Sequence, residues 1–319
     1  MQKNDKNAKA GKIKNKRGAT HNLNESGNVK AVVDADKNIT VTATDTSGDM
    51  KIERDKWIDM VVALGGSYDP DPGIGLNWSG DEKSINFQTS GIQLPDDCHT
   101  LFSGFKGPIL GCDKLDTSDV TNMFGMFWWT KEANPDVSNW DTSKVTNMMY
   151  MFLWAEKANP DVSNWNTSNV INMARMFRGA RLANPDVSDW ETSKVTNMVH
   201  MFSETKKANP DVSNWDMGEV TNMQGMFRGS GIKKADLSKW ELNLDVLNNF
   251  ENTRSMFDGC SSLEYLKTPT GLKTSTSGVN SDFKIVKLAK GSPATVEKES
   301  QNLNAEYTIN SGGDKDAEC

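Results

Sequence analysis

An aspartate recurs at every twenty-fifth position through the middle of the chain. It is the most regularly repeated residue whose side chain could take part in binding or catalysis. Like charges at one-turn spacing repel, so each carboxylate needs either backbone amide donors and solvent or a cation shared with a neighbour. The sequence leaves two alternatives, capping of backbone N–H groups and calcium binding. The column consists of Asp136, Asp161, Asp186, Asp211 and Asp236.

Carboxylates could also act as general acid and base, for example in an enzyme that cleaves polysaccharides. Such catalysis needs two groups in unequal environments that separate their pKa values, whereas a repeated column gives every aspartate the same surroundings. The chain also contains no G-x-S-x-G, H-E-x-x-H, P-loop or G-x-G-x-x-G context. We therefore expect no enzymatic activity.

Four cysteines and three histidines are the remaining candidates for metal or redox chemistry. The cysteines show no C-x-x-C spacing and the histidines are scattered, so we expect no metal site and no cofactor. Cys98 and Cys112 fall at interior positions of the first repeat. A disulfide between them and two free buried thiols are both compatible with that placement.

The aspartate column is one position of a 25-residue block that is written five times between 115 and 239. A fixed period of this length is typical of repeat proteins, in which no repeat can bury its apolar face alone. Such proteins mostly offer extended binding surfaces and rarely clefts for chemistry. The successive blocks begin at Leu115, Trp140, Trp165, Trp190 and Trp215.

The second block predicts a short helix followed by a short strand. Three N-cap residue types follow its tryptophan, and Val145, Met148 and Phe152 then have the i, i+3, i+7 spacing of a helix face. Pro160 forbids further helix, and 161–163 alternates like a strand. The expected fold class is an α/β repeat solenoid. This would be a leucine-rich-repeat-like coil with a short strand plus a short helix per 25-residue turn and small β-rich caps.

Stacking would convert each position of the block into a column. We expect the valine, methionine and phenylalanine columns to form the core. We expect an asparagine column to bond the backbones of the turns, because buried amides and carbonyls need partners. That column is Asn122, Asn147, Asn172, Asn197 and Asn222.

Composition and charge divide the chain into four regions. Residues 1–17 carry seven Lys or Arg against one Asp, while the whole chain has a net charge of −7, so the remainder is acidic and argues against a nucleic-acid partner. No apolar run predicts a signal peptide or a transmembrane segment. The expected regions are a basic disordered tail (1–27), a small N-terminal α+β region (28–83), the solenoid of about seven turns (84–272) and a C-terminal β region or linker (273–319).

Positions that differ between blocks are free of the packing pattern, and we expect them to face solvent and to build a binding surface. On adjacent turns they supply aromatic side chains with arginine neighbours, a composition typical of interaction sites. The alternative is that an N-terminal cap covers them as ordinary core. The candidate binding residues are Phe124, Trp128, Trp129, Tyr150, Trp154, Arg175 and Arg178.

The phrase DVSNWDTSKVTNMMYMF, repeated across 115–240, resembles the repeats of BspA-like leucine-rich-repeat surface proteins of bacteria. The resemblance covers about 84–272 and departs from the family at 158–160, where Ala-Asn-Pro replaces the usual leucines, so we expect a reshaped strand start. The resemblance to this family identifies no catalytic residue in the chain. The match is carried in the third block by Trp165, Thr167, Ser168, Val170, Asn172, Met173, Met176 and Phe177, and just before it by Asp161, Val162 and Ser163.

The resemblance implies a secreted or cell-surface protein. We expect a non-enzymatic extracellular binding solenoid, a bacterial surface adhesin that recognises host or bacterial proteins or glycans. The alternative is a structural spacer or stalk of a larger surface protein, with no ligand of its own.

Overall fold

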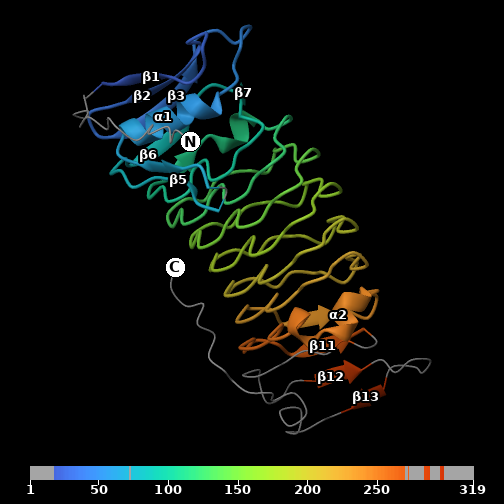
Figure 1. Ribbon diagram of the computed structural model, residues 1–319. Coiled ribbons are helices and arrows are strands. Elements are labelled where there is room, and N and C mark those ends of the chain that lie inside the picture. Colours follow the sequence, from blue (N-terminus) through green and yellow to red (C-terminus); the bar gives the residue numbers. More distant parts are fainter. Residues whose placement is uncertain (1–17, 72, 270–271, 273–283, 288–294, 298–319) are drawn as a thin grey trace, which may run out of the picture.

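The computed structural model describes residues 18–71, 73–269, 272, 284–287 and 295–297. The molecule is elongated, with a sheet and a helix at its N-terminal end, a long series of stacked turns, and a small sheet at the other end (Figure 1). Residues 1–17 of the expected basic tail (1–27) and most of 273–319 lie outside the described residues. Within the described part of the expected tail, residues 20–22 form strand β1.

The N-terminal region, expected to be α+β, contains the strands β2 and β3 and the helix α1. Five strands form one sheet in the order β1-β2-β3-β6-β8, in which β1–β2 and β2–β3 are antiparallel and the other pairs parallel. Helix α1 joins this region to the first turn of the stack, because the indole Nε1 of buried Trp57 donates to the Leu101 carbonyl at 3.0 Å. The elements are β1 (Thr20–Asn22), β2 (Val29–Val33), β3 (Asn38–Ala43), α1 (Arg54–Ala63), β4 (Ser67–Asp69), β5 (Gly75–Asn77), β6 (Ser84–Phe87), β7 (Ile92–Gln93), β8 (Ile109–Leu110), η1 (Cys112–Lys114) and β9 (Leu115–Asp116).

The expected α/β repeat solenoid, with a helix and a strand in every turn, is wrong. The described secondary structure consists mostly of small sheets with two α-helices, and neither helix belongs to a 25-residue block. Residues 117–233, all of which are described, contain turns and single β-bridges only. Successive turns meet at the bridges Asn122↔Asn147, Asn147↔Asn172, Asn172↔Asn197 and Asn197↔Asn222. We call residues 97–268 the repeat stack.

The segment expected to be a helix is a chain of tight turns because its N–H groups alternate between two kinds of acceptor. Tyr150 and Phe152 donate to the next turn, at Ala174 O (3.0 Å) and Met176 O (2.8 Å). The intervening N–H groups donate three residues back within the same turn, as from Met151 to Met148 O at 3.2 Å. A helix would need all of these donors for itself. The N-cap residue types that suggested a helix serve turns here.

The expected strand at 161–163 is also a turn. Asp161 Oδ1 accepts hydrogen bonds from the Ser163 N–H at 3.1 Å and the Ser163 hydroxyl at 2.7 Å. The same pair of bonds recurs at Asp136 and Asp186. The column of aspartates therefore caps backbone amides. These hydrogen bonds from Ser163 hold the pKa of Asp161 below its usual value.

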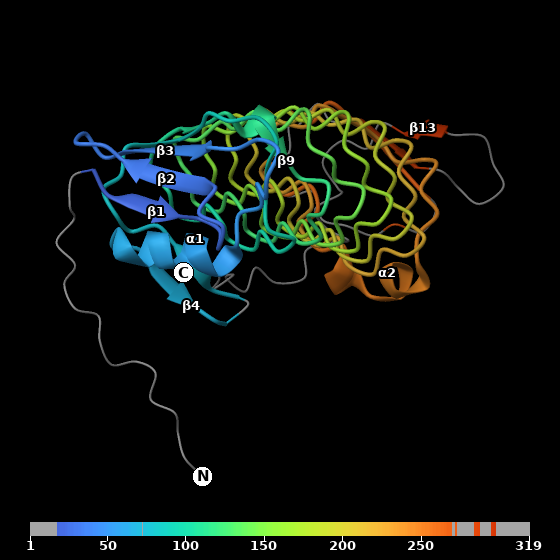
Figure 2. The same ribbon diagram turned by 90° about the horizontal axis from the view of Figure 1, so that it is seen from above.

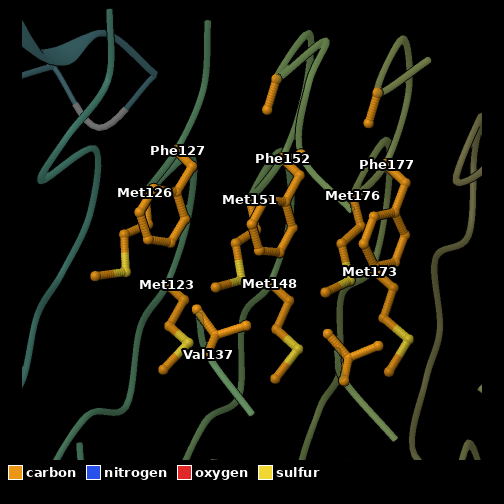
Figure 3. Close-up of a cluster of buried hydrophobic side chains, with 14 of the residues drawn as sticks. Met123, Met126, Phe127, Val137, Met148, Met151, Phe152, Met173, Met176 and Phe177 are labelled. Carbon is orange, nitrogen blue, oxygen red and sulfur yellow. The ribbon is translucent and has the colours of Figure 1, made fainter. Parts of the chain in front are cut away.

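Columns of identical side chains form the core of the repeat stack. The phenylalanine rings are fully buried and parallel, with centroids 5.3 Å apart for Phe127–Phe152 and 5.6 Å apart for Phe152–Phe177. Figure 3 shows these rings in line, beside two columns of methionine side chains that repeat the same conformation from turn to turn. Each block adds one layer to every column, as the period predicts.

Polar side chains tie the same turns together. The indole of Trp165 stacks on that of Trp140 at 6.4 Å and donates from Nε1 to the Val137 carbonyl at 3.0 Å. At the Ala-Asn-Pro corner, Asn159 donates its N–H to the Asn134 Oδ1 atom of the turn before, at 2.7 Å. The corner that departs from the BspA-like pattern is thus a ladder of asparagine side chains. The bridging asparagines also serve the backbone, as Asn147 Oδ1 accepts from Met149 N–H at 3.1 Å.

The last turn of the repeat stack is longer than the others. Met223 N–H donates to Asn252 O, whereas Met198 N–H donates to Asn222 O, and α2 and η2 occupy the extra length. Figure 2 shows α2 projecting from the outline that the turns share. Strand β10, which precedes α2, and the three strands that follow α2 form a sheet in the order β10-β11-β12-β13. The elements are β10 (Lys234–Asp236), α2 (Leu244–Asn248), η2 (Phe250–Asn252), β11 (Tyr265–Thr268), β12 (Lys284–Lys287) and β13 (Thr295–Glu297).

The cysteines of the first repeat, Cys98 and Cys112, are free and buried, so of the two sequence alternatives the structure has the unbridged one. Burial raises the pKa of both thiols far above its usual value. Cys260, at the other end of the stack, is also buried and free. These cysteines act as small core side chains.

Candidate ligand-binding face

Two positions in each turn, four residues apart, adopt the left-handed backbone conformation. Tyr150 (φ 63°) and Trp154 (φ 56°) are the pair in the second block, and Arg175 (φ 55°) and Gly179 (φ 72°) are the pair in the third. This conformation follows from the alternating hydrogen bonds. The chain bends in the opposite direction at every second residue whose N–H group donates to the next turn. Glycine adopts it without steric cost, whereas other residues lose about 1 kcal/mol or more there.

Large side chains nevertheless occupy these positions in the central turns. Flanking turns carry glycine at equivalent places, at Gly104, Gly125, Gly225 and Gly229. The side chains lean along the stack onto the following turn: a methyl group added at Gly179 would overlap the Trp154 ring, and one added at Gly225 would overlap His200. The left-handed residues with side chains in 125–229 are Trp129, Tyr150, Trp154, Arg175, His200 and Glu204.

The structure brings the aromatic residues expected from the sequence into contact. Ring centroids lie 5.2 Å apart for Phe124–Tyr150 and 5.8 Å apart for Trp128–Tyr150, and Trp129 faces Trp154 at 6.5 Å. Trp129 is 42% exposed, and the other four rings are half-buried. The sequence left two alternatives, a solvent-facing binding surface and a core covered by an N-terminal cap. Neither describes the structure fully, because the rings pack against one another and are still partly exposed.

The two arginines expected from the sequence follow on the next turn. The Arg175 guanidinium lies over the Tyr150 ring, with Cζ 5.5 Å from its centroid, and its Nη1 donates to the Tyr150 hydroxyl at 2.6 Å. Arg178 is half-buried on the same turn. We call these residues together with His200 the aromatic–arginine face: Phe124, Trp128, Trp129, Tyr150, Trp154, Arg175, Arg178 and His200.

His200 was not among the candidate residues from sequence. It occupies the same block position as Tyr150 and Arg175, which is the signal that could have found it. The side chain is only 8% exposed. Burial, followed by the positive charges of Arg178, Arg175 and Arg228, lowers the pKa of His200 to about 4. His200 is therefore neutral at pH 7 and lies among cations.

Several buried polar atoms of this face have no hydrogen-bond partner. They are Trp128 Nε1, Arg175 Nε and His200 Nδ1. A buried polar atom without a partner costs about 1 to 3 kcal/mol, so native proteins rarely keep several of them in one place. Their concentration on one surface, together with the strained backbone, marks this face as the candidate site.

A second location with a concave surface is a weaker candidate. A hollow of about 390 Å³ lies between the corner at 209–213 and β10. Its polar groups bond to neighbouring side chains, since Lys239 Nζ donates to Asn214 Oδ1 at 2.8 Å and Asp236 pairs with Lys267 at 3.8 Å. The hollow therefore offers no set of converging, unpartnered groups to a ligand.

The described residues include no group of three or more His, Cys, Asp or Glu side chains that could hold a metal ion. Each aspartate of the column accepts a hydrogen bond from a serine of its own turn, as described for Asp161.

We expect His200 to make the protein less stable in mild acid. The pKa of His200 is 6.5 in its ordinary state and about 4 in the folded protein. Between these two pH values the unfolded chain binds a proton at His200 that the folded protein does not bind. The stability from neutral His200 is complete above pH 6.5 and is lost as the pH falls toward 4, by up to about 3 kcal/mol. Urea unfolding of the wild type and His200→Gln at pH 7 and pH 4.5 measures this.

The wild type should lose about 2 to 3 kcal/mol more than His200→Gln between these two pH values. The aspartates that titrate in the same range are shared by both proteins, so their contribution cancels in the comparison. Equal losses would show that His200 is not held neutral by its surroundings.

A model of one protein family matches two overlapping segments of the chain, 96–189 and 155–270, and is described as "Mycoplasma protein of unknown function, DUF285". Together the segments span more than half of the 319 residues. No curated protein and no solved structure matches the chain. In the part of the chain that the structure describes, no helix combines the length and apolar character needed to cross a membrane.

Proposed function

We propose that this chain, which belongs to the DUF285 family of mycoplasma proteins of unknown function, is a non-enzymatic binding module whose ligand lies on the aromatic–arginine face. The BspA-like character of its repeats supports a secreted or cell-surface location, where such a module would act as an adhesin for a protein or a glycan. The repeat stack would then be the rigid support for this one variable surface.

One observation carries the proposal. Of the seven successive left-handed positions from Trp129 to Glu204, six hold Trp, Tyr, Trp, Arg, His and Glu side chains and only Gly179 is a glycine, although glycine fits equivalent positions in the flanking turns. A spacer would gain nothing from this strain, which amounts to about 1 kcal/mol or more per residue. Strained residues gather at sites where function needs the side chain.

The chain itself supplies the test substitution. Trp129→Gly and Trp154→Gly place glycine where Gly104 and Gly229 already stand in other turns. The double variant should keep its melting temperature, because relief of backbone strain offsets the packing lost with two rings that are both partly exposed, Trp129 at 42%. Against an array of matrix proteins and glycans, the wild type should bind a subset, and the double variant should bind it at least about tenfold more weakly.

Leu244→Ser is the matched control, since Leu244 is an exposed apolar side chain on α2, away from the face. It should bind like the wild type. Binding that survives in the tryptophan double variant would remove the face as the ligand site. If the wild type binds nothing on the array, the spacer function is favoured instead.

A further inference from the structure

Arg175 is a cation that lacks an anionic partner. No carboxylate lies within ion-pair distance of its guanidinium among the described residues, and its Nε atom is buried without a hydrogen bond. Within the described part of the chain, the side chain makes one polar bond, from Nη1 to the Tyr150 hydroxyl. A half-buried guanidinium normally has a carboxylate, sulfate or phosphate as its partner. Arg175 is therefore poised to take one from a ligand.

The surroundings of His200 show that positive charge accumulates here. Arg175 and Arg178 come from the turn before it and Arg228 from the turn after it, and all three disfavour a proton on its imidazole. The carboxylate of Glu204, on the same turn as His200, pairs with the Lys206 ammonium group at 2.6 Å. This is a local cationic surface on a chain whose net charge is −7.

The backbone of the face offers a peptide strand no unpaired N–H donor. From Met148 to Ala155 every N–H donates a hydrogen bond, either to the next turn or within its own turn. The same holds from Met173 to Ala180. A peptide that adds itself as a strand depends on unpaired main-chain groups. Recognition must instead use the ring faces and guanidinium groups of the side chains.

We propose that the aromatic–arginine face binds an anionic glycan, a chain of sugars that carry carboxylate or sulfate groups. The apolar faces of the sugar rings would pack on Trp129 and Trp154, and an anionic group would bond to Arg175. The proposal rests on the proposed function, because it specifies the ligand of the same face. An acidic peptide is the competing class of ligand, and the experiment separates the two.

Four probes test the ligand class on the full-length chain by isothermal titration calorimetry. Dextran sulfate and neutral dextran share one sugar backbone and differ in charge, polygalacturonate supplies carboxylates, and poly-glutamate supplies carboxylates on a peptide. We expect binding of dextran sulfate, polygalacturonate or both, no binding of neutral dextran, and affinity that falls with added salt. Stronger binding of poly-glutamate, or equal binding of neutral dextran, would overturn the proposal.

Arg175→Gln should weaken binding of the anionic glycan at least about tenfold, because a charge-assisted hydrogen bond is lost. Arg181→Gln is the matched control: Arg181 is exposed on the same turn and outside the face, and its loss should change affinity by less than about twofold. The basic residues at 1–17 are the same in every protein compared, so any contribution from them is common to all. Arg175→Lys keeps the charge and provides a second variant if Arg175→Gln folds poorly.

The imidazole of His200 gives a readout within the site. An anion bound beside the arginines should raise its pKa above about 4, which an NMR titration with and without dextran sulfate measures, with His200→Gln assigning the resonance. No shift at saturation would place the anion elsewhere and overturn the proposal. If Arg175→Gln binds normally while the Trp129→Gly and Trp154→Gly double variant does not, the anionic class fails and the proposed binding function stands.

Discussion

Phe177→Ala should lower the free energy of unfolding by about 3 to 5 kcal/mol, the largest effect that we expect from a single substitution. Phe177 is fully buried, and its ring lies between those of Phe152 and Phe202, at 5.6 and 5.7 Å. The neighbouring rings cannot close the gap, because hydrogen bonds fix the spacing of the turns. Phe152 N–H donates to Met176 O at 2.8 Å and Phe177 N–H to Met201 O at 2.9 Å.

Urea unfolding followed by tryptophan fluorescence measures the change. Ile171→Ala is the matched control, since Ile171 belongs to the same turn but is 48% exposed, and it should cost no more than about 0.5 kcal/mol. A loss below about 1 kcal/mol for Phe177→Ala would mean that the column is loosely packed and that the turns derive their stability from hydrogen bonds instead.

The sequence was sufficient to predict which side chains are buried. A position that recurs every 25 residues meets its own image in the turns before and after, so one apolar residue in a block implies a whole buried column. The ladders of Phe127 and Trp140 are therefore where the period places them. This inference needs no knowledge of the local backbone.

The backbone itself could not be predicted in this way. N-cap residues and i, i+3, i+7 spacing favour a helix when a segment is considered alone. Whether Tyr150 N–H bonds within its turn or to Ala174 O depends on the next turn, 25 residues away. Tertiary hydrogen bonding thus overrides local propensity.

The candidate face was found for a related reason. Residues that vary between blocks cannot belong to the columns, and this alone identifies Trp129, Tyr150 and Arg175. The left-handed conformation remained hidden because large side chains occupy it. The glycines at Gly125 and Gly225, which share the block position of Tyr150, were the available signal. The lowered pKa of His200 depends on its burial and on three arginines from two other turns, which no single block reveals.

Removal of one whole block should leave a folded protein, whereas removal of one residue more should not. Deletion of 191–215 takes out 25 residues and joins Trp190 to Asp216, which restores the order found at Trp140 and Asp141. Every column then loses one layer and keeps its register. Because each repeat contacts only its neighbours, we expect a cooperative unfolding transition with stability reduced by a few kcal/mol.

Deletion of 191–216 takes out 26 residues and joins Trp190 to Met217. The turn at this junction is then one residue too short, so its Asn, Met and Phe positions cannot all meet their columns. The repeat stack tolerates extra residues, as α2 in the last turn shows, because surplus chain can project outward. The loss of one residue cannot be accommodated in this way, because nearly every N–H group of the turn is hydrogen-bonded to a fixed partner.

Urea unfolding and size-exclusion chromatography of the two deletions, which differ by Asp216 alone, compare them directly. We expect a sharp transition for the shorter deletion and a broad, non-cooperative one for the longer. Equal cooperativity would mean that the turns can slide past one another, and that their register is set by the ends of the repeat stack. A failure of both would mean that the turn carrying His200 is needed for folding in its own right, contrary to the equivalence of the blocks.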